Sequence, residues 1–218
     1  MSLIKAIVFD YDDTIAQTRQ VRYKTLQSIA NEVFQYQLTN EEIDLAWGIP
    51  GDAFLLQIFG KYSNDLDFLW DTYNCYCDRD ENIPYFNAKK YIHQFQEHYK
   101  LGILSSSSRK RVFKELELML FDLKLFVSVQ TAEDTTIHKP DPKVFEPMLS
   151  ELAKLSISSE EILYVGDSIS DYHSSTGSGL QFLGMAHGQR EKKVFDKEKI
   201  SYVQSFDELD KMLRGATN

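Results

Sequence analysis

Short runs of apolar residues recur along the chain and predict the buried strands of a parallel sheet. Most runs are bounded by turn or polar residues, and segments with helical spacing lie between them. Alternation of strands and helices implies right-handed crossovers and a parallel sheet covered by helices on both faces. We therefore expect an open α/β fold. The five predicted strands are Ile4–Phe9, Leu101–Leu104, Leu125–Val129, Ile162–Val165 and Leu180–Met185.

The interval between the first and second predicted strands is too long for a single crossover. Residues 17–83 carry helical patterns and almost no strand signal, so we expect a helical domain inserted into a core domain made of residues 1–16 and 84–218. Two further helices are predicted within the core, at Arg109–Leu120 and Pro142–Leu155. Four helices are predicted in the insertion: Val21–Phe34, Glu41–Trp47, Gly51–Phe59 and Leu66–Cys77.

Composition narrows the class of protein. With 43% hydrophobic and 26% charged residues among 218, the chain is typical of a globular protein, and its net charge of −9 argues against nucleic-acid binding. No apolar stretch approaches the length that spans a bilayer, and the first apolar run, interrupted by Lys5, does not resemble a signal peptide. Cys75 and Cys77 lack the further ligands of a structural zinc site, so we expect reduced thiols in a cytoplasmic protein.

Polar residues follow four of the predicted strands. In an open parallel sheet, ligands bind outside the carboxyl ends of the strands, so these residues are expected to converge on one edge. Crowded carboxylates repel one another, and a divalent cation removes that cost. Carboxylates with water are the ligands that Mg²⁺ prefers. The four segments are Asp10–Thr14, Ser105–Ser108, His138–Pro142 and Gly166–Asp171.

The first segment carries the candidate reactive groups. A carboxylate can attack phosphorus and form an acyl phosphate, and Asp10 stands at the end of the first predicted strand. Asp12 follows two residues later, and alternate residues leaving a strand can face the same pocket. Asp12 is therefore the candidate to protonate the leaving oxygen and then to deprotonate the attacking water.

The other segments carry candidate binding groups. Lys139 offers a positive charge to the phosphoryl oxygens, while Ser105 and Ser106 offer hydroxyl and N–H donors at a helix start. Asp167 is the candidate metal ligand, and Asp171 is expected to orient the metal or its waters.

Together these residues resemble the pattern of the haloacid-dehalogenase-like superfamily. That pattern has an Asp-x-Asp-x-Thr after the first strand, a Ser or Thr after the second, a Lys before a helix, and a Gly-Asp-x-x-x-Asp. The resemblance implies a Rossmann-like three-layer α/β/α core with a helical cap domain, and a phosphatase acting on a small phosphorylated metabolite. It also implies that Mg²⁺ is held by Asp10, by the backbone carbonyl of Asp12 and by Asp167.

Particular residues bear on four alternatives to a phosphatase. Dehalogenases and phosphonatases lack a carboxylate at the position of Asp12, which counts against both. The β-phosphoglucomutases resemble this chain in core and cap, but carry a histidine where Arg22 stands here, which favours hydrolysis over a phosphosugar mutase. A low-turnover regulatory or binding protein on the same fold predicts a damaged motif, and each of the four motifs is intact.

Some candidates have an ordinary structural explanation beside the functional one. Arg22 and Trp47, in the predicted cap, are candidates for substrate contact, although charges on such helices are usually solvated and the tryptophan can simply pack. We expect Ser107 and Ser108 to serve as capping or packing residues, since serine caps helices well.

Overall fold

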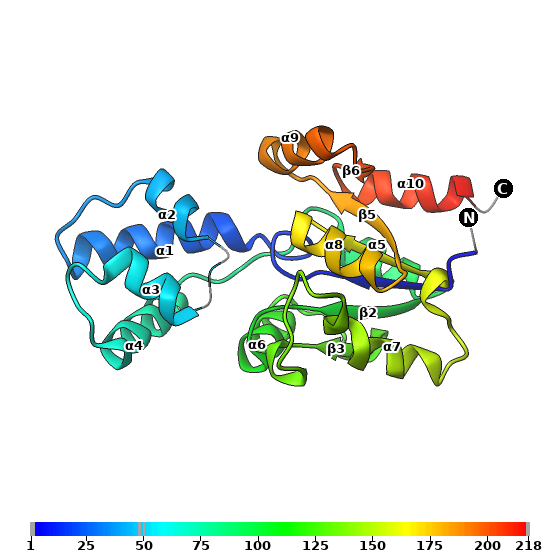
Figure 1. The fold of residues 1–218 in the computed structure, drawn as a ribbon, viewed down its shortest axis with the longest axis horizontal. Helices are drawn as coiled ribbons and strands as arrows, with labels where there is room; N and C mark the ends of the chain where they lie inside the picture. Colours follow the sequence, from blue (N-terminus) through cyan, green and yellow to red (C-terminus); the bar gives the residue numbers. More distant parts are fainter. Residues whose placement is uncertain (1–2, 48, 50, 217–218) are drawn as a thin grey trace. The chain divides into compact units, whose positions relative to one another are not determined.

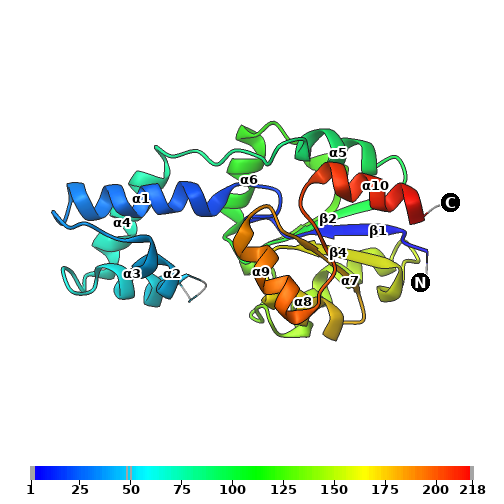
Figure 2. The same cartoon turned by 90° about the horizontal axis from the view of Figure 1, so that it is seen from above.

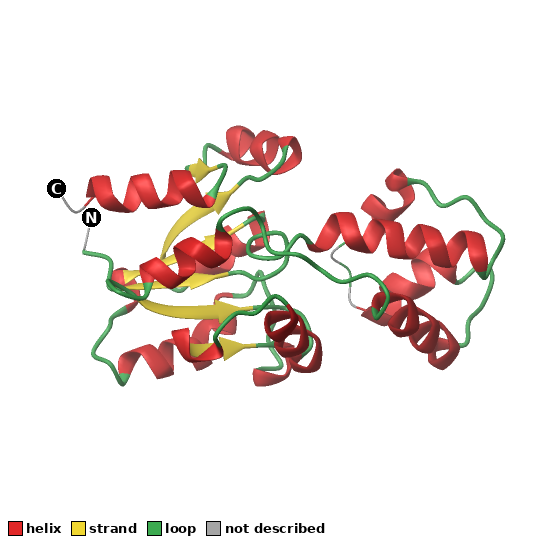
Figure 3. Cartoon of the chain, turned by 180° about the vertical axis from the view of Figure 1, so that it is seen from behind, coloured by secondary structure: helices red, strands yellow, loops and turns green. Residues whose placement is uncertain are grey.

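The computed structural model describes residues 3–47, 49 and 51–216, so residues 1–2 and 217–218 of the predicted core domain lie outside the described residues. The described chain forms two compact units (Figure 1). One contains the residues up to Gln17 and those from Ile83 onward, and the other is Thr18–Asn82. All described strands belong to the first unit, as Figure 3 shows by colour.

A six-stranded sheet forms the centre of the first unit. Its order is β3-β2-β1-β4-β5-β6, and every neighbouring pair is parallel. Each of the five predicted apolar runs forms a strand, whereas β6 was not predicted because only two residues pair there. The strands are β1 (Ala6–Phe9), β2 (Lys100–Leu104), β3 (Phe126–Gln130), β4 (Ile162–Gly166), β5 (Gln181–Met185) and β6 (Tyr202–Val203).

Helices cover both faces of this sheet, so the predicted Rossmann-like three-layer core is confirmed (Figure 2). The helices of this unit are α5 (Ala88–Phe95), α6 (Arg109–Leu118), α7 (Glu146–Ala153), α8 (Ile169–Gly177), α9 (Gln189–Glu198) and α10 (Phe206–Ala216). Side chains alternate along β1, so Ile7 and Phe9 join the core under α5, α6 and α10, while Ala6 and Val8 join the core under α7. Burial on both faces explains why the strand has an unbroken apolar sequence.

One predicted helix is interrupted. The segment predicted as a single helix, Pro142–Leu155, instead forms a 3-10 turn at Pro142–Phe145 followed by α7. Pro147 has no N–H and cannot donate to the carbonyl four residues earlier. The turn closes through the shorter bond from the Glu146 N–H to the Lys143 carbonyl.

The second unit consists of helices around a core of its own. Its helices are α1 (Thr18–Glu32), α2 (Asn40–Ala46), α3 (Gly51–Phe59) and α4 (Leu66–Cys77). Leu26, Ile43 and Phe59 are buried at its centre. Thr39 starts α2 with a capping box, since its hydroxyl accepts from the Glu42 N–H and the Glu42 carboxylate accepts from the Thr39 N–H. None of the helices formed by described residues in either unit is long and apolar enough to cross a membrane.

The two chain segments that join the sheet to the insertion are hydrogen-bonded to each other. The Gln17 N–H donates to the Ile83 carbonyl at 2.9 Å, and the Tyr85 N–H donates to the Ile15 carbonyl at 2.8 Å. His187, after β5, supports this pair: its ring stacks on Tyr85 at 3.4 Å between centroids, and its Nε2 lies 3.0 Å from the carbonyl oxygen of Thr14.

We expect His187 to make the stability of the protein depend on pH. Burial lowers the pKa of His187 below its ordinary value, so the unfolded chain takes up this proton first as the pH falls. The contribution of neutral His187 is therefore complete above about pH 6.5 and is lost as the pH falls through the lowered value. We expect His187→Gln to have a lower urea midpoint than wild type at neutral pH, with the difference shrinking in acid. A difference that stays constant between the two pH values would contradict this.

Candidate active site

The strand order places the first and fourth motifs side by side. The chain adds β2 and β3 on one side of β1, and β4, β5 and β6 on the other side, so the strand order reverses between β1 and β4. Ligands bind in the crevice at such a reversal. Asp10 directly follows β1, and its N–H donates to the Val165 carbonyl on β4 at 2.8 Å. Asp167 directly follows β4, so the two carboxylates start from neighbouring strand ends.

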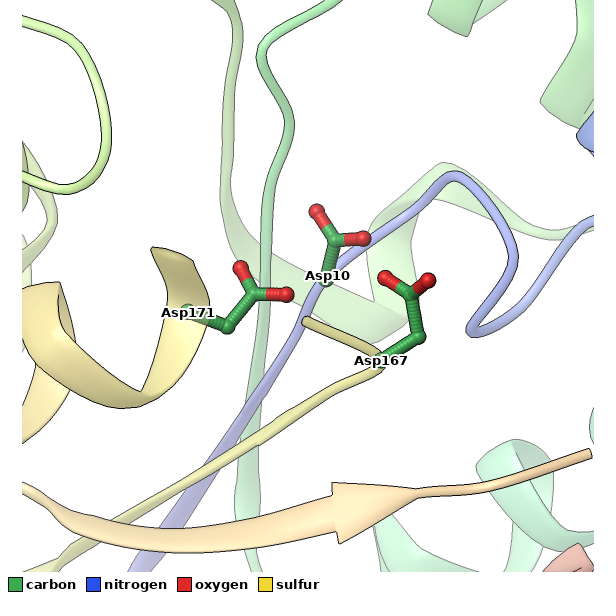
Figure 4. A group of neighbouring side chains, drawn as sticks. All are labelled: Asp10, Asp167 and Asp171. Carbon is green, nitrogen blue, oxygen red and sulfur yellow. The ribbon is translucent and has the colours of Figure 1, made fainter. Parts of the chain in front are cut away.

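Three carboxylates converge at this edge of the sheet. Asp10, Asp167 and Asp171 each offer an oxygen, and these oxygens all lie within 4.8 Å of one another (Figure 4). Asp10 is 6% exposed and Asp171 only 1%, so water screens little of their repulsion. A donor set made entirely of carboxylate oxygens suits a hard divalent cation such as Mg²⁺.

Lys139 lies between two of these carboxylates. Its Nζ is 2.6 Å from Asp10 Oδ1 and 2.7 Å from Asp171 Oδ1, and its side chain is 6% exposed. Burial raises the pKa of Asp10 to about 8, although Lys139 opposes the rise. Burial by itself lowers the pKa of Lys139, but the two carboxylates outweigh it and hold that pKa above its ordinary value. The lysine therefore stays charged beside the candidate nucleophile.

Asp171 is held by protein groups on both of its oxygens. Oδ2 accepts from the Ser168 hydroxyl at 2.6 Å and from the Ser168 N–H at 3.0 Å, in the capping box that starts α8. Oδ1 accepts from Lys139 and, at 3.2 Å, from the buried hydroxyl of Tyr164. With both oxygens engaged, Asp171 is better suited to orienting its neighbours than to binding a cation directly. Asp10 and Asp167 are then the side chains best placed as ligands.

Gly166 leaves the space that Asp171 occupies. A Cβ atom at Gly166 would lie 2.7 Å from Asp171 Cγ and 2.8 Å from its Cβ, so an added methyl group must displace the carboxylate. We expect Gly166→Ala to lower activity or the apparent affinity for Mg²⁺ by about 10- to 100-fold, as when a group orienting metal ligands is lost. Magnesium titration of the activity measures this.

Two other glycines provide matched controls for Gly166→Ala. A Cβ at Gly215 would meet no atom within 4 Å, so Gly215→Ala is expected to behave like wild type. A Cβ at Gly184 would lie 2.6 Å from the Phe195 ring, so Gly184→Ala is expected to lower the melting temperature without changing the magnesium dependence. If Gly184→Ala weakens magnesium dependence as much as Gly166→Ala does, the effect is a general loss of packing.

The serine segment lies against Asp12. The Ser105 hydroxyl, buried at the end of β2, is 3.4 Å from Asp12 Oδ2, and Ser106 beside it is exposed. The Ser107 hydroxyl donates to Asp12 Oδ2 at 2.7 Å. The expectation that Ser107 only caps or packs is therefore wrong, because the turn after β2 directs its side chain toward the first motif. Ser108 precedes α6 without a side-chain capping bond.

The first unit thus brings together six of the predicted residues: Asp10, Asp12, Ser105, Lys139, Asp167 and Asp171. It also adds residues that the sequence analysis did not single out. Arg111 and Glu115 on α6 form a chain of polar contacts to Asp12, and Tyr164 on β4 supports Asp171. The spacing of four between Arg111 and Glu115 predicts a pair on one helix face, but nothing in the sequence ties that pair to Asp12.

The two remaining candidates belong to the helical unit. Arg22 is 3% exposed and donates to the Asp80 carbonyl at 3.5 Å, within that unit. Trp47 packs against the rings of Tyr23 and Phe54, and the Arg19 guanidinium lies 4.7 Å from its ring centroid. The predicted contacts of Arg22 and Trp47 with substrate stay predictions.

The chain is similar to known proteins over most of its length. The family model described as haloacid dehalogenase-like hydrolase matches residues 7–185. A curated relative from Caldanaerobacter subterraneus, named "Putative pyrophosphatase PpaX", is 28% identical, over 97% of this chain and 96% of the relative.

Solved structures share the fold over nearly the whole chain. A "predicted phosphoglycolate phosphatase" from Haemophilus somnus has a TM-score of 0.79 at 18% identity, covering 97% of this chain and 99% of its own. The "putative HAD-hydrolase YfnB" from Bacillus subtilis, bound to magnesium, has a TM-score of 0.77 at 19% identity, with the same coverage of 97% and 99%.

Proposed function

The chain belongs to the haloacid dehalogenase-like hydrolase family, and we propose that it is a magnesium-dependent phosphatase of small phosphorylated metabolites. The observation that carries the proposal is the arrangement around Asp10. A buried carboxylate at a strand end contacts a buried lysine and lies beside two further carboxylates, with Asp12 two residues along the chain. These residues are the candidates for the nucleophile, for the cation that holds the phosphoryl group and for the metal-binding set, and their proximity supports the proposal.

The metal-binding residues that we propose are Asp10, the backbone carbonyl of Asp12 and Asp167, with Asp171 orienting them. When bound there, Mg²⁺ supplies positive charge that offsets the negative charge of the phosphoryl oxygens and of the clustered carboxylates. The relative from Bacillus subtilis, whose structure contains magnesium, supports this choice of ion for the fold.

The residues of the chain then divide the reaction into two displacements. Asp10 attacks phosphorus, a bond forms between its oxygen and phosphorus, and the bond from phosphorus to the leaving oxygen breaks. The Asp12 carboxyl gives its proton to that leaving oxygen. In the second displacement, the Asp12 carboxylate takes a proton from water as the water oxygen bonds to phosphorus, and the bond from phosphorus to Asp10 breaks, which releases phosphate and restores the Asp10 carboxylate. Lys139 and the Ser105 hydroxyl hold the transferring phosphoryl oxygens throughout, with Ser106 beside them.

The substrate class follows from the relatives and from the second unit. Proteins named pyrophosphatase and phosphoglycolate phosphatase act on small phosphorylated molecules, and we extend that class to this chain. We propose that the helical unit Thr18–Asn82 is the cap implied by the family, with Arg22 and Trp47 as its candidate substrate contacts. A cap that closes on a small substrate excludes water from the first displacement.

Phosphate release tests the proposed function. The purified chain is incubated with a panel of phosphorylated metabolites, including pyrophosphate and phosphoglycolate, with Mg²⁺ and with the metal removed by a chelator. Magnesium-dependent release of phosphate supports the proposal and identifies the best substrate. A phosphosugar mutase would instead convert one sugar phosphate into its isomer in the presence of a bisphosphate, without net release. Binding of Mg²⁺ and ligands without turnover of any compound favours a regulatory protein.

A further inference from the structure

A chain of polar contacts runs from the protein core to Asp12. It starts at Tyr11, whose hydroxyl donates to Glu115 Oε2 at 2.7 Å. The other oxygen of Glu115, Oε1, accepts from Arg111 Nε at 3.0 Å. Tyr11 is fully buried and Glu115 is 7% exposed, so the inner end of this chain is held in the core.

The outer end of the chain fixes both carboxylate oxygens of Asp12. Arg111 Nη2 donates to Asp12 Oδ1 at 2.7 Å, and the Ser107 hydroxyl donates to Asp12 Oδ2 at 2.7 Å. Arg111 Nη1 donates to that same Ser107 hydroxyl at 2.9 Å. The planar guanidinium therefore makes three bonds in fixed directions, and the Asp12 carboxylate is held in one orientation.

Stability alone is a weak reason for such an arrangement. An ion pair between partly exposed side chains, such as Arg111 with Asp12 at 28% and 27% exposure, contributes little to folding. Burying Glu115 costs desolvation energy that its bonds only offset. Tyr11 and Asp12 are neighbours in the chain, so α6 holds the segment after β1 at two consecutive residues. These contacts therefore fix the position of the Asp12 side chain.

We propose that Arg111, anchored by Glu115 and Tyr11, is a positioning residue that holds the Asp12 carboxyl group for proton transfer to the leaving oxygen. The inference rests on the proposed function, in which Asp12 gives its proton as the bond from phosphorus to the leaving oxygen breaks. Proton transfer requires that the donor and acceptor atoms lie within hydrogen-bond reach, and a small misplacement slows the step strongly.

The dependence of rate on the leaving group tests this role. An alkyl phosphate needs a proton on its departing oxygen, whereas p-nitrophenyl phosphate releases a stable anion that does not. The value of kcat/KM reports the steps up to departure of the leaving group. We expect Arg111→Met to lower kcat/KM for the alkyl phosphate by about 10- to 100-fold and to lower it much less for the aryl phosphate. Asp12→Asn is expected to show the same selectivity more strongly.

Matched variants separate positioning from other roles. Arg109→Met removes an exposed arginine from the same helix, one whose partner Asp134 lies outside the site, and is expected to match wild type on both substrates. Tyr11→Phe removes only the inner anchor and is expected to show a smaller effect with the same leaving-group selectivity. Arg111→Lys keeps the charge but not the fork of donors, and is expected to recover only part of the rate on the alkyl phosphate.

A double-mutant cycle completes the test. In an Asp12→Asn background, Arg111→Met is expected to lower kcat/KM no further, because the group it positions is already gone. Equal losses on both substrates, or additive losses in the cycle, would overturn the proposal and assign Arg111 to substrate binding or to folding. Failure of the proposed function is a different result, namely that the wild type turns over neither substrate with Mg²⁺.

Discussion

Replacing Asp10 with asparagine is expected to abolish phosphate release, lowering kcat by about 10⁴-fold or more, as when a covalent nucleophile is removed. The amide is nearly isosteric with the carboxylate but cannot form the acyl phosphate. Folding is expected to survive, because the change removes a buried carboxylate that lies beside Asp171 and leaves Lys139 paired with Asp171. Steady-state phosphate release and thermal melting, measured on the same preparations, check the two expectations together.

The control for this variant lies three residues further along. Asp13 is buried in the same turn and has a φ of 54°, a backbone conformation that asparagine accepts readily. Asp13→Asn makes the same chemical change without touching the proposed nucleophile, and is expected to retain activity close to wild type. In acid-quenched reactions, intact mass is expected to show one added phosphoryl group on wild type and none on Asp10→Asn. Undiminished turnover in Asp10→Asn would place the nucleophile elsewhere.

Replacing Lys139 with methionine is expected to lower kcat by about 10²- to 10³-fold, since a group aimed at developing charge is lost. The same change leaves Asp10 and Asp171 without their shared cation, and loss of one member of a buried ion pair costs about 3–5 kcal/mol of stability. We therefore expect a clear fall in melting temperature in the absence of metal.

Magnesium distinguishes the two effects of Lys139→Met. Mg²⁺ at the carboxylate cluster would take over part of the charge compensation that Lys139 provides, so the rise in melting temperature on adding Mg²⁺ is expected to be larger in the variant than in wild type. Activity is not expected to recover with it. Lys143→Met, at an exposed lysine in the following 3-10 turn, is the control and is expected to match wild type in both measurements. An equal rise in both proteins would mean that Lys139 does not offset the carboxylates.

Much of the fold was predictable because a strand that is buried on both faces of the sheet is an unbroken run of apolar residues. The central strands β1, β2 and β4 are apolar runs because nearly all of their residues are buried between two helical layers, whereas β3 is buried only at its two end residues. The strand β6 was not predicted because it has only two residues, Tyr202 and Val203, which are too few to form a recognisable apolar run. The break before α7 was predictable in principle, because Pro147 cannot continue a hydrogen-bonded helix from Pro142.

The convergence of the motif residues could be inferred from topology, because the carboxyl ends of parallel strands meet at one edge. The residues that hold these motif side chains in place could not be inferred from the sequence. Tyr164 and Tyr11 look like ordinary core residues in the sequence, and only the direction of each hydroxyl, toward Asp171 and toward Glu115, shows what they contact. Ser107 differs from Ser108 only by one position in a turn. Side-chain direction in such turns depends on backbone angles that apolar periodicity does not encode.

The paired segments Ile15–Gln17 and Ile83–Tyr85 also bear on how this architecture can be assembled and altered. Because the two ends of the insertion leave the sheet side by side, the whole helical unit occupies the place of a single loop between β1 and α5. The entropy of closing a loop grows only slowly with its length, so the sheet tolerates an insertion of this size at small cost. Insertions succeed where the ends meet at the surface, and the second unit has its own apolar core. We therefore expect the helical unit to be exchangeable in evolution: recombination at this hydrogen-bonded pair of segments would replace the proposed cap while leaving the proposed catalytic carboxylates in place.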